Sequence, residues 1–300
     1  MHVVITGSTG LIGTALVKKL SALGHQVTRL VRRTPRPGEA RWDPNEGTIE
    51  AHALEGANAV VHLAGAGIGD HRWTPAYKCE LVDSRVRGTE LLATTLATLD
   101  RKPTVMLSAS GVGYYGSRGD ETLDESSTAG NDFLADLCSR WESATAPAAD
   151  AGLRVAHLRT GIVLAASGGA LSKQLPLFKF GLGGKLGSGK QWQSWIALED
   201  EVSAIVHLLT ADVHGPVNLT APTPVTQLDF AKTLGHVLHR PTFVPIPRFG
   251  PKLLLGTELA HSLLFSGQRV LPKVLRESGY TFEHATLEDA LRSLLGRPAA

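Results

Sequence analysis

Several features of specialised protein classes are missing from this chain of 300 residues. Only two cysteines occur, Cys79 and Cys138, with no CxxC spacing and no histidine cluster beside them, so we expect neither a disulfide framework nor a bound metal. No apolar run is long enough to cross a membrane, and the first residues enter a strand pattern without the features of a signal peptide. These absences predict a cytoplasmic protein.

An excess of one charge is also missing. The chain has 30 Lys and Arg against 28 Asp and Glu, and no basic run is dense enough for a nucleic-acid groove or an anionic membrane surface. We therefore expect neither nucleic acid nor a membrane as a partner, and nothing in the sequence indicates an oligomeric state. Apolar residues make up 43% of the chain, which predicts a core of ordinary size for one large domain with a smaller lobe.

Strand and helix patterns alternate through the first half of the chain. Short β-branched runs predict buried strands at 2–6, 27–31, 59–63, 104–107 and 153–158. Helical spacing of apolar residues predicts helices at 11–23, 75–99 and 131–149. This alternation predicts an α/β fold, a Rossmann doubly wound parallel sheet with helices on both faces.

The pattern changes after residue 165. Glycines crowd residues 167–195, which we interpret as a long loop, and 257–295 is expected to be mostly helical. We expect residues 1–165 to form the Rossmann core, with 200–220 completing it. Residues 166–300 would then form the glycine-rich loop and a smaller, mostly helical C-terminal lobe on the substrate side.

The turn after the first strand carries a phosphate-binding signature. Three glycines with the spacing GxxGxxG stand between a strand and a helix, in the segment Gly7-Ser8-Thr9-Gly10-Leu11-Ile12-Gly13. The first glycine allows the tight turn, the second lets the backbone approach a pyrophosphate, and the third lets the helix pack on the strand. The helix N-terminus then presents free N–H groups to the anion. We expect all seven residues to contact a dinucleotide.

The end of the second strand distinguishes NADP from NAD. An acid there would bind the ribose 2′-hydroxyl, but this strand ends with Arg32 and Arg33, and no acid precedes Glu39. Arginine suits a 2′-phosphate, so the sequence favours NADP as the cofactor. The alternative is that both arginines are solvated surface charges.

These motifs, together with His62-Leu63-Ala64-Gly65, resemble the extended short-chain dehydrogenase/reductases, the group of the nucleotide-sugar epimerases. Further strings resemble one atypical branch, the epimerase-like family of bacterial YfcH-type proteins with its own C-terminal domain of unknown function, here at about 247–296. They are Arg72-Trp73-Thr74-Pro75, Ser84 to Thr89, Ser108 to Gly116, Asp132 to Ala135, Leu158 to Leu164, Gly187 to Trp192 and Ser266 to Pro272.

The resemblance implies further cofactor contacts at the carboxyl ends of the strands. Leu63, Ala64 and Gly65 would lie beside the cofactor ribose, Ser108 and Ala109 would lie at the next strand end, and Thr160 and Gly161 would approach the nicotinamide. It also implies a small-molecule substrate, such as a nucleotide sugar, between the Rossmann core and the C-terminal lobe.

The chain departs from an active reductase of this superfamily at one helix. Such enzymes carry a proton-donating tyrosine and, four residues later, a lysine that lowers the pKa of that tyrosine. Here Leu134 and Cys138 stand at the corresponding positions, and the predicted helix 131–149 has neither Tyr nor Lys. The usual serine is best matched by Ser110.

Three interpretations remain open. In the first, Ser110 and Tyr114 are catalytic in an oxidoreductase or epimerase, the alternative being that Tyr114 is a packing aromatic. In the second, Arg85 binds cofactor or substrate and acts electrostatically, with Glu80 on the same surface. In the third, the protein binds NADP(H) without turnover, as a sensor or interaction protein.

Four lysines punctuate the glycine-rich segment, at positions 173, 179, 185 and 190. They could hold a diphosphate or another anion of the substrate, or they could be solvated charges on a loop. The sequence leaves both alternatives open.

Overall fold

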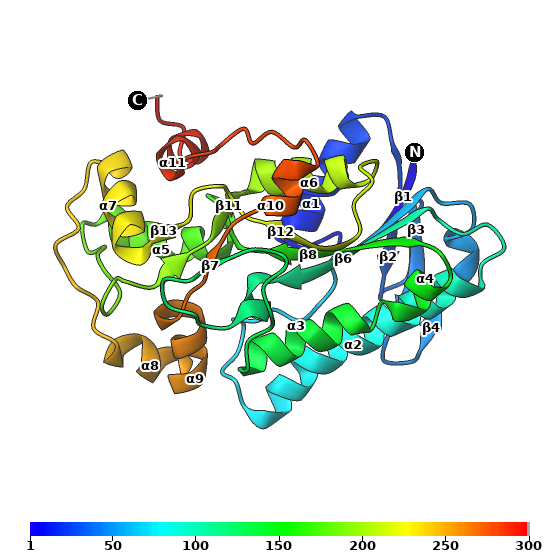
Figure 1. Cartoon of the computed structure of the whole chain (residues 1–300), viewed down its shortest axis with the longest axis horizontal. Coiled ribbons are helices and arrows are strands. Elements are labelled where there is room, and N and C mark those ends of the chain that lie inside the picture. The colour runs from blue at the N-terminus through cyan, green and yellow to red at the C-terminus, as the bar shows by residue number, and fades with distance from the viewer. Residues whose placement is uncertain (299–300) are drawn as a thin grey trace.

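The computed structural model describes residues 1–298 and has an eight-stranded sheet at its centre (Figure 1). The spatial order is β12-β8-β6-β5-β1-β2-β3-β4, and every neighbouring pair is parallel except β3–β4. The strands are β1 (His2–Thr6), β2 (Gln26–Val31), β3 (Glu39–Asp43), β4 (Thr48–Ile49), β5 (Ala59–His62), β6 (Val105–Gly111), β8 (Arg154–Thr160) and β12 (Gly215–Leu219). The expected Rossmann sheet is confirmed.

Helices cover both faces of this sheet because its strands are apolar on both sides. Val3 and Ile5 of β1 belong to the core under α1 (Leu11–Ala22) and α6 (Leu198–Leu208), while Val4 belongs to the core on the opposite face. That opposite face is covered by α2 (Pro75–Thr98), α3 (Phe133–Ser143) and α4 (Ala146–Asp150). Successive residues of a strand point to opposite faces, so a buried parallel strand must be apolar throughout.

Two local predictions need correction. The helix expected over 131–149 is two helices, α3 and α4, and Pro147 lies in the first turn of the second, where its missing N–H removes no hydrogen bond. The glycine-rich segment is not one loop, because α5 (Gly169–Lys179) forms within it. Its apolar residues recur at helical spacing, at Leu171, Leu175 and Phe178, while the glycines gather at its two ends.

A third core lies on the C-terminal side of the sheet. It brings α5 together with β9 (Ile162–Ala165), β11 (Trp195–Ala197), α7 (Gln227–Leu238) and α11 (Leu287–Leu294). Short elements complete this side: β7 (Thr122–Leu123), β10 (Trp192–Gln193), β13 (Val225–Thr226), α8 (Phe249–Leu255), α9 (Thr257–Ala260), β14 (Arg269–Val270) and α10 (Lys273–Glu277). With the π-helix His261–Phe265, the helices α9, α10 and α11 make residues 257–295 mostly helical, as expected.

Across residues 1–298, none of the helices combines the length and apolar character that crossing a bilayer would require.

Candidate cofactor site

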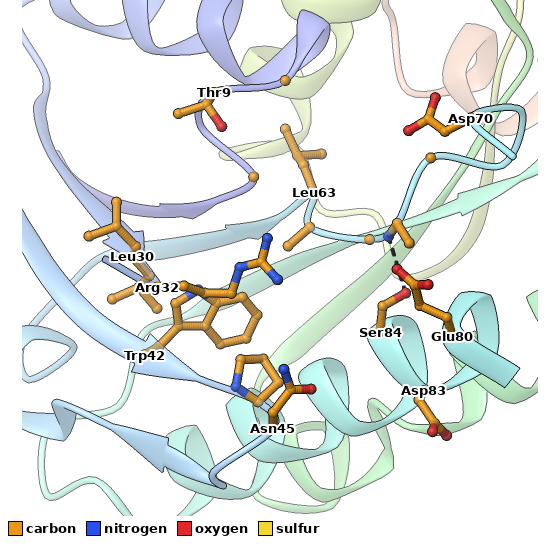
Figure 2. A pocket seen from close by; sticks show the side chains of 18 of the residues that line it. Thr9, Leu30, Arg32, Trp42, Asn45, Leu63, Asp70, Glu80, Asp83 and Ser84 are labelled. Atoms are coloured by element: carbon orange, nitrogen blue, oxygen red, sulfur yellow. Dashed lines mark hydrogen bonds between the residues drawn. The ribbon is translucent and has the colours of Figure 1, made fainter. Parts of the chain in front are cut away.

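A cavity of about 980 Å³ opens at the carboxyl edge of the sheet. Its walls are the turn between β1 and α1, the ends of β2 and β5, the turn after β3, and the first half of α2 (Figure 2). The carboxyl edge at which the strand order reverses is where doubly wound sheets bind their ligands. The predicted phosphate loop lies at this edge.

The three loop glycines have different surroundings. Gly7 has a φ of +67°, and a Cβ atom there would lie 2.6 Å from the carbonyl carbon of Leu63. A Cβ at Gly13 would lie 2.2 Å from the Gly7 carbonyl oxygen, so the helix could not pack on the turn. Gly10 has no such conflict, since its nearest atom would be 3.4 Å away, and it lines the cavity with Ser8 and Thr9. Leu11 and Ile12 follow as the first residues of α1, whose initial N–H groups have no partners within the helix.

A buried hydrogen-bond chain fixes the strand end beside the loop. Thr6 Oγ1 accepts from the backbone N–H groups of Leu63 and Ala64, at 3.1 and 3.2 Å. His62 bonds Thr6 through Nδ1 at 2.7 Å and Thr89 through Nε2 at 2.9 Å. Burial, with a smaller effect of Arg85, lowers the pKa of His62 to about 4. His62 is therefore a neutral orienting residue, and Leu63, Ala64 and Gly65 are held in the cavity wall.

The two adjacent arginines have different environments. Arg33 Nη2 lies 2.7 Å from Glu39, which also pairs with Arg29 at 3.1 Å. Arg32 has no carboxylate partner within residues 1–298, and Figure 2 shows its side chain in the cavity beside Trp42 and Asn45. Both arginines line the cavity, but only Arg32 has a guanidinium not already paired with a carboxylate.

The α2 wall is acidic and polar. Glu80 and Asp83 line the cavity, and Ser84 Oγ accepts from the Ala66 N–H at 3.1 Å, which ties the segment after β5 to the helix (Figure 2). Glu80 therefore lies in the cavity wall.

Arg85 lies behind this wall rather than in it. Its guanidinium stacks 4.8 Å from the Trp141 ring, Nη1 donates to the Leu81 carbonyl at 3.1 Å, and a Cβ at Gly65 would lie 3.2 Å from Cζ. Only 8% of Arg85 is exposed, and burial lowers the pKa of its guanidinium. Within residues 1–298 no carboxylate forms a salt bridge with it.

Ser110 and Tyr114, the candidate catalytic residues, belong to a separate polar network. Ser110 donates to Glu142 at 2.7 Å, and the same carboxylate takes two bonds of 2.8 Å from Arg159. The Arg159 guanidinium lies 3.4 Å from the Tyr114 ring centroid and donates to Tyr115. Neither Ser110 nor Tyr114 is among the described residues that line the cavity.

The two helix positions that we expected to correspond to a reductase's Tyr-Lys pair are occupied by packing residues. A Cβ at Gly113 would lie 3.1 Å from Leu134 Cβ, so Leu134 closes tightly on the segment after β6. Cys138 is buried, and burial raises the pKa of its thiol to about 11. At these two positions the helix therefore presents an apolar contact and a neutral thiol.

The other strand-end residues are also committed to internal contacts. Thr160 donates to Glu201 at 2.9 Å, and complete burial raises the pKa of Glu201 to about 8. A Cβ at Gly161 would lie 2.3 Å from the Ser194 carbonyl oxygen. Ser108 and the neighbouring Ala109 lie on β6, and Ser108 Oγ is buried with no hydrogen-bond partner among the described residues.

Sequence reasoning missed part of the cavity wall. Trp42, Pro44 and Asn45 come from the β3–β4 hairpin, which was not expected. The only signals were the alternation of buried Ala40 and Trp42 and the turn-forming Pro44-Asn45 that follows.

Two family matches together span nearly the whole chain. Residues 3–219 match the "NAD dependent epimerase/dehydratase family", and residues 246–294 match the "Domain of unknown function (DUF1731)". A curated relative, "Epimerase family protein Mb2239" of Mycobacterium bovis, is 44% identical over 298 residues, which cover 99% of this chain and 98% of the relative.

Two solved structures are similar along the whole chain. The human epimerase family protein SDR39U1 (isoform 2), crystallised with NADPH, has a TM-score of 0.91 at 35% identity, with 99% of both chains covered. A protein described as a nucleoside-diphosphate sugar epimerase, from Corynebacterium glutamicum, has a TM-score of 0.81 at 40% identity, covering 99% of this chain and 58% of that one.

Proposed function

Since this chain belongs to the NAD dependent epimerase/dehydratase family, as an atypical short-chain dehydrogenase/reductase, we propose that it binds NADP(H) in the cavity at the sheet edge. The observation that carries the proposal is Arg32, a guanidinium in the cavity wall with no carboxylate partner within residues 1–298. The NADPH in the similar human structure supports the same assignment.

The residues present suit each part of the dinucleotide. Gly10 leaves room for a pyrophosphate at the start of α1, where the helix dipole favours an anion. Arg32 would hold the 2′-phosphate, and Trp42 and Asn45 would border the adenine. Leu63, Ala64 and Gly65 would lie along the nicotinamide ribose. When bound, the dinucleotide would supply a hydride donor or acceptor.

The reaction we propose is an NADP-linked oxidoreduction or epimerisation that does not use a Tyr-Lys pair. Arg85 lies directly behind Gly65, so it would contribute positive charge there in place of the lysine. Ser110 and Tyr114 remain the predicted catalytic pair, and to act they would have to give up contacts with Glu142 and Arg159. Nucleotide sugars are the substrate class to try first, because a relative of 40% identity carries that description.

Two measurements test this function. Calorimetric titration with NADPH and with NADH should show tighter binding of NADPH, and equal affinities would contradict the cofactor assignment. Screening carbonyl compounds and nucleotide sugars for NADPH oxidation or epimerisation tests the chemistry. If an activity is found and survives both Tyr114→Phe and Ser110→Ala, those two catalytic roles are wrong.

A non-catalytic role, as an NADP(H)-binding sensor or interaction protein, is the second candidate. It is favoured by the tight packing of Leu134 and the burial of Cys138. The double variant Leu134→Tyr with Cys138→Lys distinguishes a site that no longer supports hydride transfer from a reductase that has merely lost its Tyr-Lys pair. We expect it to gain no hydride transfer and to be destabilised by several kcal/mol, because it buries an ammonium without a partner. A stable double variant with new reductase activity would show a drifted reductase instead.

A further inference from the structure

The large apolar side chains that are exposed gather in one part of the described chain. Of the eleven within residues 1–298, all but Met1, Leu23 and Leu263 lie in two segments, 177–185 and 240–255. These eight are Leu177, Phe180, Leu182, Phe243, Val244, Phe249, Leu253 and Leu254. The helix α8 has no buried residue at all. We call the two segments together the lobe-edge surface.

The two segments lie side by side although about 55 residues separate them in the sequence. Arg240 Nε donates to the Lys179 carbonyl at 2.8 Å, and the Ile246 N–H donates to the Lys185 carbonyl at 2.9 Å. Figure 1 shows the chain leaving α7 along the outer edge of the C-terminal lobe and continuing into α8. The two segments that carry the exposed apolar side chains are therefore neighbours in the fold.

The charged residues within these two segments have a single sign. The lobe-edge surface contains five cations and no Asp or Glu, namely Lys179, Lys185, Arg240, Arg248 and Lys252. Within residues 1–298 none of the five forms a salt bridge. These cations come from two segments that are distant in the sequence, so they form no basic run there and come together only in the folded protein.

We propose that the lobe-edge surface binds peripherally to an anionic lipid bilayer. Exposed phenylalanine and leucine side chains can enter the boundary between headgroups and acyl chains, while lysine and arginine pair with lipid phosphates. Apolar patches of this kind on a soluble domain mark interaction sites. The expectation of no membrane partner rested on linear charge runs and is revised here.

The side-chain chemistry favours a bilayer over two other occupants. Single-stranded nucleic acid is bound by cations with aromatic stacking, but five of the eight exposed apolar side chains are aliphatic and cannot stack on bases. A second copy of this chain in a twofold interface would bring the same surface against itself. Its five cations would then face five cations with no acid between them.

Co-sedimentation of the full chain with vesicles tests the proposal. One set contains phosphatidylcholine alone, and in the other about a third of the lipid is phosphatidylglycerol. We expect binding to the anionic vesicles that decreases with salt, and little binding to the neutral ones. Phe180→Ser with Phe243→Ser and Leu253→Ser should reduce binding by roughly tenfold or more. The matched control Leu23→Ser, exposed but outside the surface, should bind as the unmodified chain does.

Variants that remove charge from this surface test vesicle binding without replacing any apolar side chain. Lys179→Gln with Lys252→Gln should weaken binding to anionic vesicles by roughly tenfold, whereas Lys18→Gln with Lys19→Gln on α1 should change it little. Unchanged NADPH affinity in each variant shows that the fold is intact. Absence of vesicle binding overturns the proposal. So does a dimer, or a complex with single-stranded RNA, that these substitutions abolish while vesicle binding is absent.

Discussion

The two ends of the carboxyl sheet edge differ in how their polar side chains are occupied. At the proposed adenine end, the loop backbone is open and Arg32 extends into the cavity without a carboxylate partner in the described chain. At the proposed nicotinamide end, Ser110 donates to the half-buried carboxylate of Glu142, and Thr160 donates to the buried carboxylate of Glu201. The adenine end has groups available for a ligand, whereas Ser110 and Thr160 at the nicotinamide end are already hydrogen-bonded within the protein.

This contrast explains why the structure supports cofactor binding more directly than it supports catalysis. The cofactor-binding end needs hydrogen-bond donors at which a ligand can replace water. The catalytic end needs a titratable group within hydrogen-bond reach of the reacting atom. Here the polar groups nearest the nicotinamide end are bonded to other groups of the protein. Substitutions at the two ends should therefore separate stability from cofactor affinity.

The largest expected effect comes from breaking the pair between Glu142 and Arg159. Glu142→Gln leaves a guanidinium whose side chain is 4% exposed without its carboxylate. We expect a loss of about 3–5 kcal/mol in the free energy of unfolding, measured by denaturant titration, with NADPH affinity in the folded protein unchanged. Asp136→Asn on the same helix breaks an exposed pair and should change stability little. A large fall in NADPH affinity with intact stability would contradict this division.

The glycine loop offers the next effect, at the other end of the site. Gly13→Ala places a Cβ 2.2 Å from the Gly7 oxygen and should destabilise the protein by about 3 kcal/mol. Gly10→Ala meets no such atom, so it should fold normally and lose NADPH affinity, since its methyl group would occupy the pyrophosphate position. Thermal melting with a parallel titration distinguishes them. Equal stability losses would show that both glycines act only in packing.

A smaller effect concerns pH. The folded pKa of Glu201, about 8, lies above its ordinary value of 4.5, so the unfolded chain releases this proton first as pH rises. The contribution of Glu201 to stability is complete below about pH 4.5 and is lost progressively up to about pH 8. Glu201→Gln should remove this slope. Its advantage over the unmodified chain in the free energy of unfolding should therefore grow by roughly 2 kcal/mol from pH 5 to pH 7. Glu199→Gln, exposed on the same helix, should keep the slope.

The sequence was most informative where structure is local. The strand, the glycine loop and the helix of residues 2–23 follow from glycine spacing and apolar periodicity within a few residues, and the position of Arg32 follows from the end of β2. The family resemblance and the Rossmann sheet are confirmed by the family match and the fold.

The rest depended on contacts between distant segments. Glu142 meets Arg159 across 17 residues and Thr160 meets Glu201 across 41, and neither pairing leaves a periodic pattern in the sequence. The hairpin that carries Trp42 and Asn45 has strands of only five and two residues, too short for a clear alternation. The different surroundings of Arg32 and Arg33 likewise depend on Glu39, which reaches them only through the pairing of β2 with β3.

The central claim, that Arg32 binds the 2′-phosphate of NADP(H), is tested most directly by calorimetric titration of Arg32→Ala and Arg33→Ala with NADPH and NADH. Arg32→Ala should weaken NADPH binding by roughly tenfold to thirtyfold and leave NADH binding nearly unchanged, because it removes one charge-assisted contact. Arg33→Ala, which removes a partner of Glu39, should affect NADPH much less. An Arg32→Ala protein that still prefers NADPH as strongly as the unmodified chain would contradict the account.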